Sequence, residues 1–431
     1  MGMMLSVRAE IQGQGLFRLK PRHAATLELV HRGFQSVIAD PLTSMLFRTL
    51  KHRDEYLTLQ LHPAADPLYF DFDEGVLCCQ ASTHAAGPGY HAYLIETLEQ
   101  VARECHFTWY LASDDGDTTG FWHHRDFSLL QESMARWLQG LARSVAAQQA
   151  TGLLISLPEG FRPVADAYAL TPLGPRPREW FARAATAGDA ELFSLAADFF
   201  PWWNAGLTAE CWRNIGLVLS WCEVPWHPPA STDERRLYNI ALAAFQFAQS
   251  RSLPVPEAAI AEMIRITAMS PDAPLPPAPE GLGYLRSQVA ITLYGGWTIT
   301  LPGYFYRRET ENGDMVFWYG DRTIHCTTLT AAKEDVFIPI DDLFTATQSS
   351  LPAEHQQYQE LAHDLQRGWR AEAYATINAD TYHSMHGAWA VDGHACVLTI
   401  CYETPDDAAW ADTVWRSIWW AGPVREFVEV R

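Results

Sequence analysis

The dipeptide Asp392-Gly393 stands between two apolar runs, GAWAV and HACVLTICYE, and constrains the fold more than any other feature of this sequence. A type I′ turn needs positive φ at both central residues, and Asp-Gly adopts this conformation readily. The dipeptide therefore predicts a β-hairpin. In that hairpin Val391 pairs with His394 and Trp389 with Cys396, which places His394 and Cys396 on one face of a sheet.

The same stretch, from His383 to Cys396, holds three histidines and one cysteine, which raises the alternative of a transition-metal site. Zinc motifs use paired ligands about two to four residues apart, and His383 and His386 meet this condition. His394 and Cys396 lie one residue apart, which the hairpin explains without a metal. The interpretation is therefore structural, and the sequence predicts neither a metal nor a cofactor.

Bulk composition sets the class of protein. The chain has 431 residues, 48% of them hydrophobic, and this length predicts two or three domains. No apolar run approaches the roughly 18 to 20 residues of a membrane helix, and the start MGMMLSVRAEIQGQGLFRLK lacks a secretory signal. Eight cysteines without a C-x-x-C pair indicate free thiols in a reducing compartment. These features predict a cytoplasmic protein.

Negative charge is concentrated near the end of the chain. The net charge is −20, and residues 284–431 contribute half of it, with 10 Lys plus Arg against 20 Asp plus Glu. A nucleic-acid-binding protein needs a positive surface, so this distribution argues against that class. It favours a basic partner, or else it only keeps the protein in solution.

Composition also divides the chain into four parts, which together predict an α+β fold. Residues 1–160 alternate strands with amphipathic helices and form an α+β domain, and 161–269 form a helical region packed on it. The helical region is expected to hold four helices over 178–269, one opened by a Ser231/Glu234 capping box. Residues 270–283 contain five prolines and form a linker. Residues 284–431 form a C-terminal α/β sandwich: three strands over 288–330, a helix over PAEHQQYQELAHDLQRG, a strand over 369–378, the hairpin and a closing helix.

The segment ASDDGDTTGFWHHRDF is the best candidate for a catalytic or metal site. Its titratable residues are Asp114, Asp115, Asp117, His123, His124 and Asp126. They miss the spacing of an EF-hand calcium loop. A solvated loop followed by a helix that Asp126 caps explains them more simply. Motifs of the P-loop, G-x-S-x-G and H-E-x-x-H kinds are absent from the sequence, so we assign no catalytic residue.

Three segments of the last third carry a family resemblance: GWTITLPGYF, VLTICYE in the second half of the hairpin, and WADTVWRSI. In this order they resemble the Mog1/PsbP-like fold, which includes small bacterial adaptor domains for toxin export. The whole layout resembles the immunity proteins that bacteria encode beside polymorphic toxins of the Rhs and type VI secretion kind. Within that group it is most similar to large two-domain immunity proteins paired with ADP-ribosyltransferase toxins.

The resemblance implies a protein that binds a cognate toxin in a 1:1 heterocomplex and occludes the toxin's active site, with no nucleic-acid or membrane partner. Acidic side chains would attract the toxin, and aromatic side chains would anchor it. The expected contacts are Trp318, Tyr319, Glu334, Asp335, Asp341, Asp342, Glu403, Asp406 and Asp407. Two alternatives stay open: a secretion adaptor for a toxin, and a metal-dependent hydrolase that uses residues 114–126 to reverse a toxin's modification.

Overall fold

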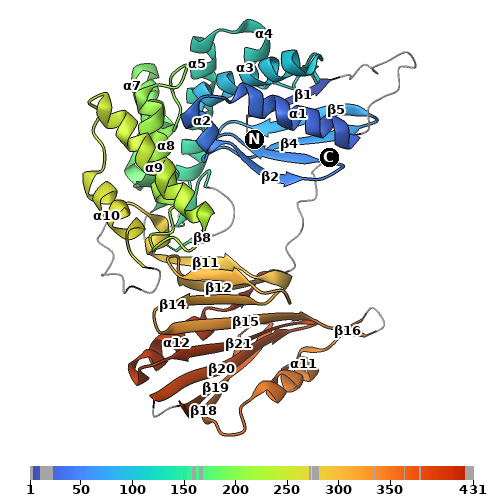
Figure 1. The fold of residues 1–431 in the computed structure, drawn as a ribbon, viewed down its shortest axis with the longest axis vertical. Coiled ribbons are helices and arrows are strands. Elements are labelled where there is room, and N and C mark those ends of the chain that lie inside the picture. The colour runs from blue at the N-terminus through green and yellow to red at the C-terminus, as the bar shows by residue number, and fades with distance from the viewer. Residues whose placement is uncertain are drawn as a thin grey trace.

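A computed structural model describes residues 3–9, 23–148, 150, 152–157, 162–164, 168–270, 273, 281–333, 336–363, 365–377 and 380–422. Figure 1 shows two parts, which we name the body (residues 3–270) and the C-terminal module (residues 281–422). Both parts contain helices and sheets, so the predicted α+β class is confirmed. Within the described ranges, every helix is too short or too polar to cross a lipid bilayer.

The first half of the body is a six-stranded sheet covered by helices (Figure 1). The strand order is β2-β3-β4-β5-β1-β6, which leaves β2 at one edge. The strands are β1 (Met4–Ala9), β2 (Arg48–His52), β3 (Leu57–Gln60), β4 (Leu68–Asp73), β5 (Val76–Ser82) and β6 (Tyr110–Leu111). The helices are α1 (His23–Val37), α2 (Pro41–Leu46), α3 (Pro88–Cys105), α4 (Phe121–His124) and α5 (Phe127–Ala146).

The second half of the body is helical, as predicted, but holds five helices in place of four. They are α6 (Arg178–Thr186), α7 (Asp189–Phe199), α8 (Ala209–Cys222), α9 (Thr232–Ser250) and α10 (Glu257–Thr267). The first expected helix is broken at Ala187, whose extended ψ of 141° ends α6. Ser231 caps α9 as predicted, because its hydroxyl accepts from the Glu234 N–H at 3.1 Å. A small sheet of β7 (Leu153–Leu154), β9 (Ala169–Thr171) and β10 (Gly174–Arg176) lies beside these helices.

The C-terminal module is built on a seven-stranded antiparallel sheet of order β13-β14-β15-β21-β20-β19-β18. Its strands are β13 (Tyr306–Glu309), β14 (Met315–Tyr319), β15 (Arg322–Thr330), β18 (Gln356–His363), β19 (Gln366–Ile377), β20 (Asp380–Val391) and β21 (His394–Tyr402). Helix α11 (Ile340–Thr347) packs with Ala388 and Ala390, whereas α12 (Ala408–Arg416) packs with Trp389. Because neighbouring strand residues point to opposite sides, the two helices cover opposite faces.

One predicted helix of the module is wrong. Residues of PAEHQQYQELAHDLQRG form β18, which pairs with β19 at the edge of the large sheet. Its sequence QQYQELAH has helix-forming residues, but the open edge of β19 supplies backbone partners that an isolated helix would lack, and tertiary pairing overrides propensity. Helix α11 was not expected from the sequence, and residues 288–330, expected to form three strands, form five.

A second, smaller sheet connects the module with the body. Its order is β22-β12-β11-β8, with β8 (Arg162–Pro163), β11 (Gln288–Thr292), β12 (Trp297–Pro302) and β22 (Trp419–Trp420). Strand β8 belongs to the body by sequence, yet it pairs with β11 across the predicted linker, most of which lies outside the described residues. The Tyr306 hydroxyl of β13 donates to the Pro228 carbonyl of the body at 2.9 Å. Body and module therefore share both backbone and side-chain hydrogen bonds.

Candidate functional site

The Asp392-Gly393 turn gives the predicted hairpin register and organises one end of the large sheet, but it is not the expected type I′ turn, because Gly393 has positive φ and Asp392 does not. Val391 pairs with His394 and Trp389 pairs with Cys396. Gly393 has φ 75°, and a Cβ atom there would lie 2.3 Å from the ring of Phe337. Its N–H donates to the Ile338 carbonyl at 2.8 Å. The turn therefore holds β17 (Val336–Phe337), which pairs with β16 (Ala332–Lys333), against the end of the hairpin.

Aromatic rings gather around this turn, and two of them, Tyr294 and Phe337, are exposed to solvent. The His394 ring lies 5.2 Å from the Phe337 ring and 5.5 Å from the Trp420 ring, centroid to centroid. The Trp420 indole donates to the Gly295 carbonyl, next to Tyr294. Tyr294 is 81% exposed and Phe337 is 54% exposed, whereas His394 is 8% exposed. We name Tyr294, Phe337, His394 and Trp420 the turn-end patch.

Acidic side chains adjoin the turn-end patch at the start of α11. The Asp392 carboxylate accepts from the Ile340 N–H at 2.9 Å and so caps this helix, whose first turn holds Asp341 and Asp342. All three carboxylates belong to exposed residues. Asp341 also forms an ion pair with Arg367. The predicted contacts Asp341 and Asp342 are thus placed beside exposed aromatic rings.

The other predicted acidic contacts lie elsewhere. Glu403 and Asp406 are exposed near α12, on the opposite side of the sheet from α11. Asp407 is half-buried and pairs with Arg322 at 2.6 Å. Glu334 and Asp335 lie outside the described residues. The predicted acidic contacts therefore do not form one surface, because the helices near them cover opposite faces of the sheet.

Trp318 and Tyr319, the expected aromatic anchors, pack within the molecule. The Trp318 ring stacks on the Tyr306 ring at 5.4 Å, and the Tyr319 ring meets the Tyr304 ring at 5.0 Å. Both residues are only half-exposed. Since Tyr306 also donates to Pro228, this aromatic group supports the contact between module and body. The expected role as freely exposed anchors is a poor fit to this packing.

The histidines of the hairpin are spread along the sheet and do not converge. The His383 ring stacks on Tyr402 at 5.7 Å, and the His386 ring contacts the hydroxyls of Ser384 at 3.0 Å and Thr399 at 3.3 Å. The Thr330 hydroxyl lies 3.1 Å from His394 Nδ1. Within the described ranges, none of these histidines joins a group of three potential metal ligands. The structural interpretation of the stretch therefore fits the geometry.

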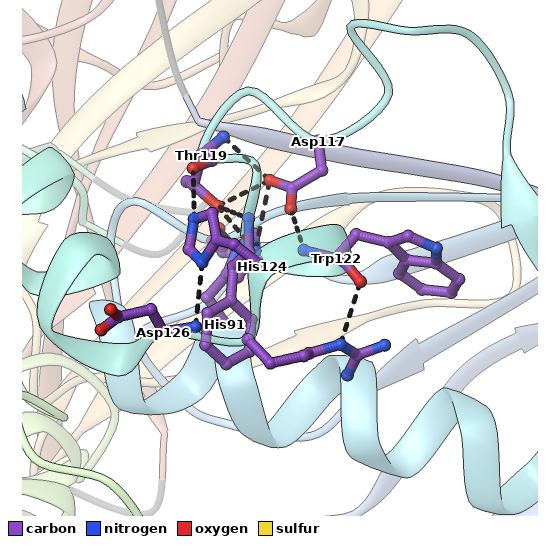
Figure 2. A network of polar contacts seen from close by, with 9 residues as sticks. His91, Asp117, Thr119, Trp122, His124 and Asp126 are labelled. Atoms are coloured by element: carbon purple, nitrogen blue, oxygen red, sulfur yellow. Dashed lines mark hydrogen bonds and ion pairs between the residues drawn. The ribbon is translucent and has the colours of Figure 1, made fainter.

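The acid-rich segment 114–126 is organised by one buried carboxylate, as Figure 2 shows. Asp117 Oδ1 accepts from the Thr119 hydroxyl at 2.7 Å, and Oδ2 accepts from the Trp122 N–H at 2.7 Å. His91 of α3 lies 3.4 Å from Oδ1 through its Nε2, and its Nδ1 lies 2.8 Å from the Thr83 hydroxyl. The side chains of His91 and Asp117 are fully buried. This network ties the loop to the core of the body.

The electrostatics of this network favour an ionised Asp117. Burial opposes the charge, but the hydrogen bond and charge of His91, with the Trp122 N–H and the Thr119 hydroxyl, lower the pKa of Asp117 well below its usual range. Asp126 caps α5 as predicted, accepting from the Ser128 N–H at 2.9 Å.

The remaining members of the segment do not complete a site. Asp114, Asp115 and His123 are exposed, and His124 bonds to the backbone at Thr119 and Asp126. These residues supply no group of three metal ligands in the part of the chain that the structure describes. The segment is a loop followed by a helix that Asp126 caps, as expected, but it is not solvated throughout, because the Asp117 side chain is fully buried.

A cavity of about 390 Å³ lies where body and module meet, and no sequence motif indicated it. Its polar lining includes Arg48, Gln60, Asp66, Ser156, Glu223 and Arg307, drawn from both parts of the molecule. Arg48 pairs with Glu223 at 2.7 Å, and Glu223 Oε1 is buried without a hydrogen-bond partner among the described residues. Burial raises the pKa of Glu223, although the Arg48 guanidinium opposes this. The described lining therefore combines two arginines with two carboxylates.

No family model matches this chain, and no curated protein sequence matches it. Among solved structures, the cyanobacterial PsbP protein of Synechocystis is similar at 13% identity with a TM-score of 0.25, over 34% of this chain and 99% of that one. A crystal structure from Bacteroides thetaiotaomicron is similar at 9% identity with a TM-score of 0.24, over 29% of this chain. The present chain spans 44% of that Bacteroides protein.

The predicted resemblance to the Mog1/PsbP-like fold thus has a weak structural counterpart over part of the chain. Its immunity-protein component has no counterpart in these similarities.

Proposed function

We propose that this chain is an immunity protein, which neutralises an antibacterial toxin by binding it through the turn-end patch and occluding its active site. The observation that carries the proposal is the exposure of Phe337 beside the acidic start of α11, together with the exposure of Tyr294 in the same patch. Exposed aromatic clusters bordered by polar groups are typical of protein interfaces, because they combine a large apolar area with few rotatable bonds.

Charge would speed the association of the two proteins, and apolar contact would stabilise the complex. Residues 284–431 carry 10 more acidic than basic side chains, so the module attracts a basic partner and speeds the encounter. Asp342 and Asp392 would then border the contact, while Phe337 and Tyr294 enter pockets of the toxin and are removed from water. A basic toxin is therefore the partner that this surface fits best.

Co-expression with the product of an adjacent toxin gene tests the proposal. We expect survival to depend on this chain, and the purified proteins to form a complex at a 1:1 ratio. The double variant Phe337→Ala, Tyr294→Ala removes two anchors and should weaken the complex by at least about 30-fold, corresponding to a hot-spot loss of about 2 kcal/mol. Tyr374→Ala is the matched control, because Tyr374 is 62% exposed on β19 of the same module.

Each outcome separates the candidate functions. Equal affinity of the patch variant and the Tyr374→Ala control would exclude the turn-end patch as the interface. A complex that leaves the toxin active would identify a secretion adaptor and overturn neutralisation. The toxin's chemistry is tested separately: if it is an ADP-ribosyltransferase, transfer from labelled NAD⁺ should stop when this chain is added in equimolar amount.

A further inference from the structure

Two histidines and a glutamate meet on the surface of the body, far from the turn-end patch. Glu28 and His31 lie on α1 and His52 lies at the end of β2, and their potential ligand atoms are all within 4.8 Å of one another. Residues three apart on a helix share a face, and edge strand β2 brings the third side chain to it. Within the described ranges, no other group of three such side chains is this close.

The distances within this group are near those of a metal centre. His52 Nε2 lies 3.8 Å from Glu28 Oε2, and the centroids of the two imidazole rings are 5.1 Å apart. Zinc bonds of about 2.0 to 2.2 Å in a tetrahedral site place ligand atoms about 3.3 Å from one another. The side chains of Glu28 and His52 are partly exposed, so small rotations are enough to close this difference.

The surroundings also orient and prepare the ligands. The Thr49 hydroxyl of β2 lies 2.8 Å from His31 Nε2, and a proton on Nε2 leaves the Nδ1 lone pair for a metal.

The donor set identifies the class of ion. Two imidazoles and one carboxylate favour zinc and similar transition metals over calcium or magnesium, which prefer oxygen ligands alone. Three protein ligands also leave one position of a tetrahedron for water or for a group of a bound molecule. The competing cation is Arg32, whose Nε lies 3.4 Å from Glu28, but its side chain is 65% exposed and can turn toward solvent.

We propose that Glu28, His31 and His52 form a binding site for one divalent transition-metal ion on the surface of the body. This site is independent of the proposed toxin binding, because its residues lie on α1 and β2 and the turn-end patch lies on the C-terminal module (Figure 1).

Calorimetric titration of the metal-free full chain with Zn²⁺ tests the proposal. We expect one equivalent to bind at pH 7.5, and the variant His31→Ala, His52→Ala to weaken that binding by at least about tenfold. His325→Ala changes an exposed histidine of the module and should leave the affinity unchanged. Arg32→Ala removes the competing cation and should tighten binding, an effect that a purely structural role for these residues would not produce.

The other results would overturn the site. If no Zn²⁺ binds, or if binding is unchanged in the double variant, these residues do not form a metal site. If binding is lost when His383 and His386 are changed together, the metal site lies on the hairpin. Glu28→Gln guards against a folding defect, because it keeps the shape of the side chain and should still weaken binding. If the metal-free variants and the unchanged protein have equal melting temperatures, the differences in Zn²⁺ affinity are due to the site and not to a folding defect.

Discussion

The body and the C-terminal module use their polar and aromatic side chains in opposite ways. In the body one continuous core runs from Met3 to Ile266, and the acid-rich loop turns its Asp117 inward to His91. In the module the large sheet carries separate cores on its two faces, and rings at the turn end point outward. The difference indicates that the acid-rich loop of the body is tied to the core through Asp117, whereas aromatic rings at the turn end of the module are exposed.

Removing the inward-facing carboxylate should have the largest effect. Asp117→Ala leaves His91, the Thr119 hydroxyl and the Trp122 N–H without their partner, and we expect a loss of about 3 kcal/mol in the free energy of unfolding. Because the pKa of Asp117 is lowered on folding, its contribution is present above pH 3.8 and is lost as the pH falls below that value. Urea unfolding at pH 7 and at lower pH measures both effects.

Asp115→Ala is the control for this variant, since Asp115 is exposed in the same loop. Its expected effect is within about 0.5 kcal/mol. Equal losses for the two variants would contradict the assignment of the loop's structural role to Asp117, and with it the contrast between body and module.

An intermediate effect is expected at the turn of the module. Gly393→Ala places a Cβ against the Phe337 ring and strains a left-handed backbone, at a cost of about 2 kcal/mol. Gly313→Ala is matched, because Gly313 has φ 84° and open space around its Cβ position, and about 1 kcal/mol is expected there. The difference between the two variants in chemical unfolding measures the packing of β17 on the turn. If the two costs are equal, Phe337 is not held by Gly393.

The smallest effect is expected at the cavity between body and module. The folded protein holds the Glu223 proton more tightly than the unfolded chain, whose glutamates titrate near pH 4.5. The stability due to this proton is complete below pH 4.5 and is lost as the pH rises through the raised pKa of the folded state. The stability of the unchanged protein should therefore fall relative to Glu223→Gln as the pH is raised from 4.5 to 7, measured by thermal unfolding. If the stability of the unchanged protein instead rises relative to Glu223→Gln with increasing pH, the charge of Arg48 outweighs burial in setting the pKa of Glu223.

Local sequence patterns predicted those features whose hydrogen bonds join residues close together in the sequence. The Asp-Gly turn gave the hairpin register to the residue, and Asp126 and Ser231 cap the helices expected of them. Tryptophans of the helical region are expected in the core: Trp202, Trp212 and Trp226 are at most 3% exposed, whereas Trp203 and Trp221 are only partly buried. Caps and two-residue turns involve neighbours in sequence, so a single sequence contains the information they need.

The sequence did not predict features whose interacting residues come from distant segments of the chain. The residues of β18 have helical propensity, and only the edge of β19 makes them a strand. The acidic residues of the module were expected to act together because of their charge. However, side chains alternate between the two faces along β20, and α11 and α12 pack on opposite faces. Glu28, His31 and His52 meet because α1 packs beside β2, a contact that neither spacing nor composition expresses. The turn-end patch likewise joins four segments that lie apart in the sequence.

The pairing of β8 with β11 determines how the molecule can be divided. A fragment that starts at the proline-rich linker would lack Arg162 and Pro163, and the backbone of β11 would lose its neighbour on that side. Exposed strand edges recruit other chains. Separate production of the last third is therefore expected to give self-association, and a deletion series that aims to localise toxin binding should retain the short strand of the body.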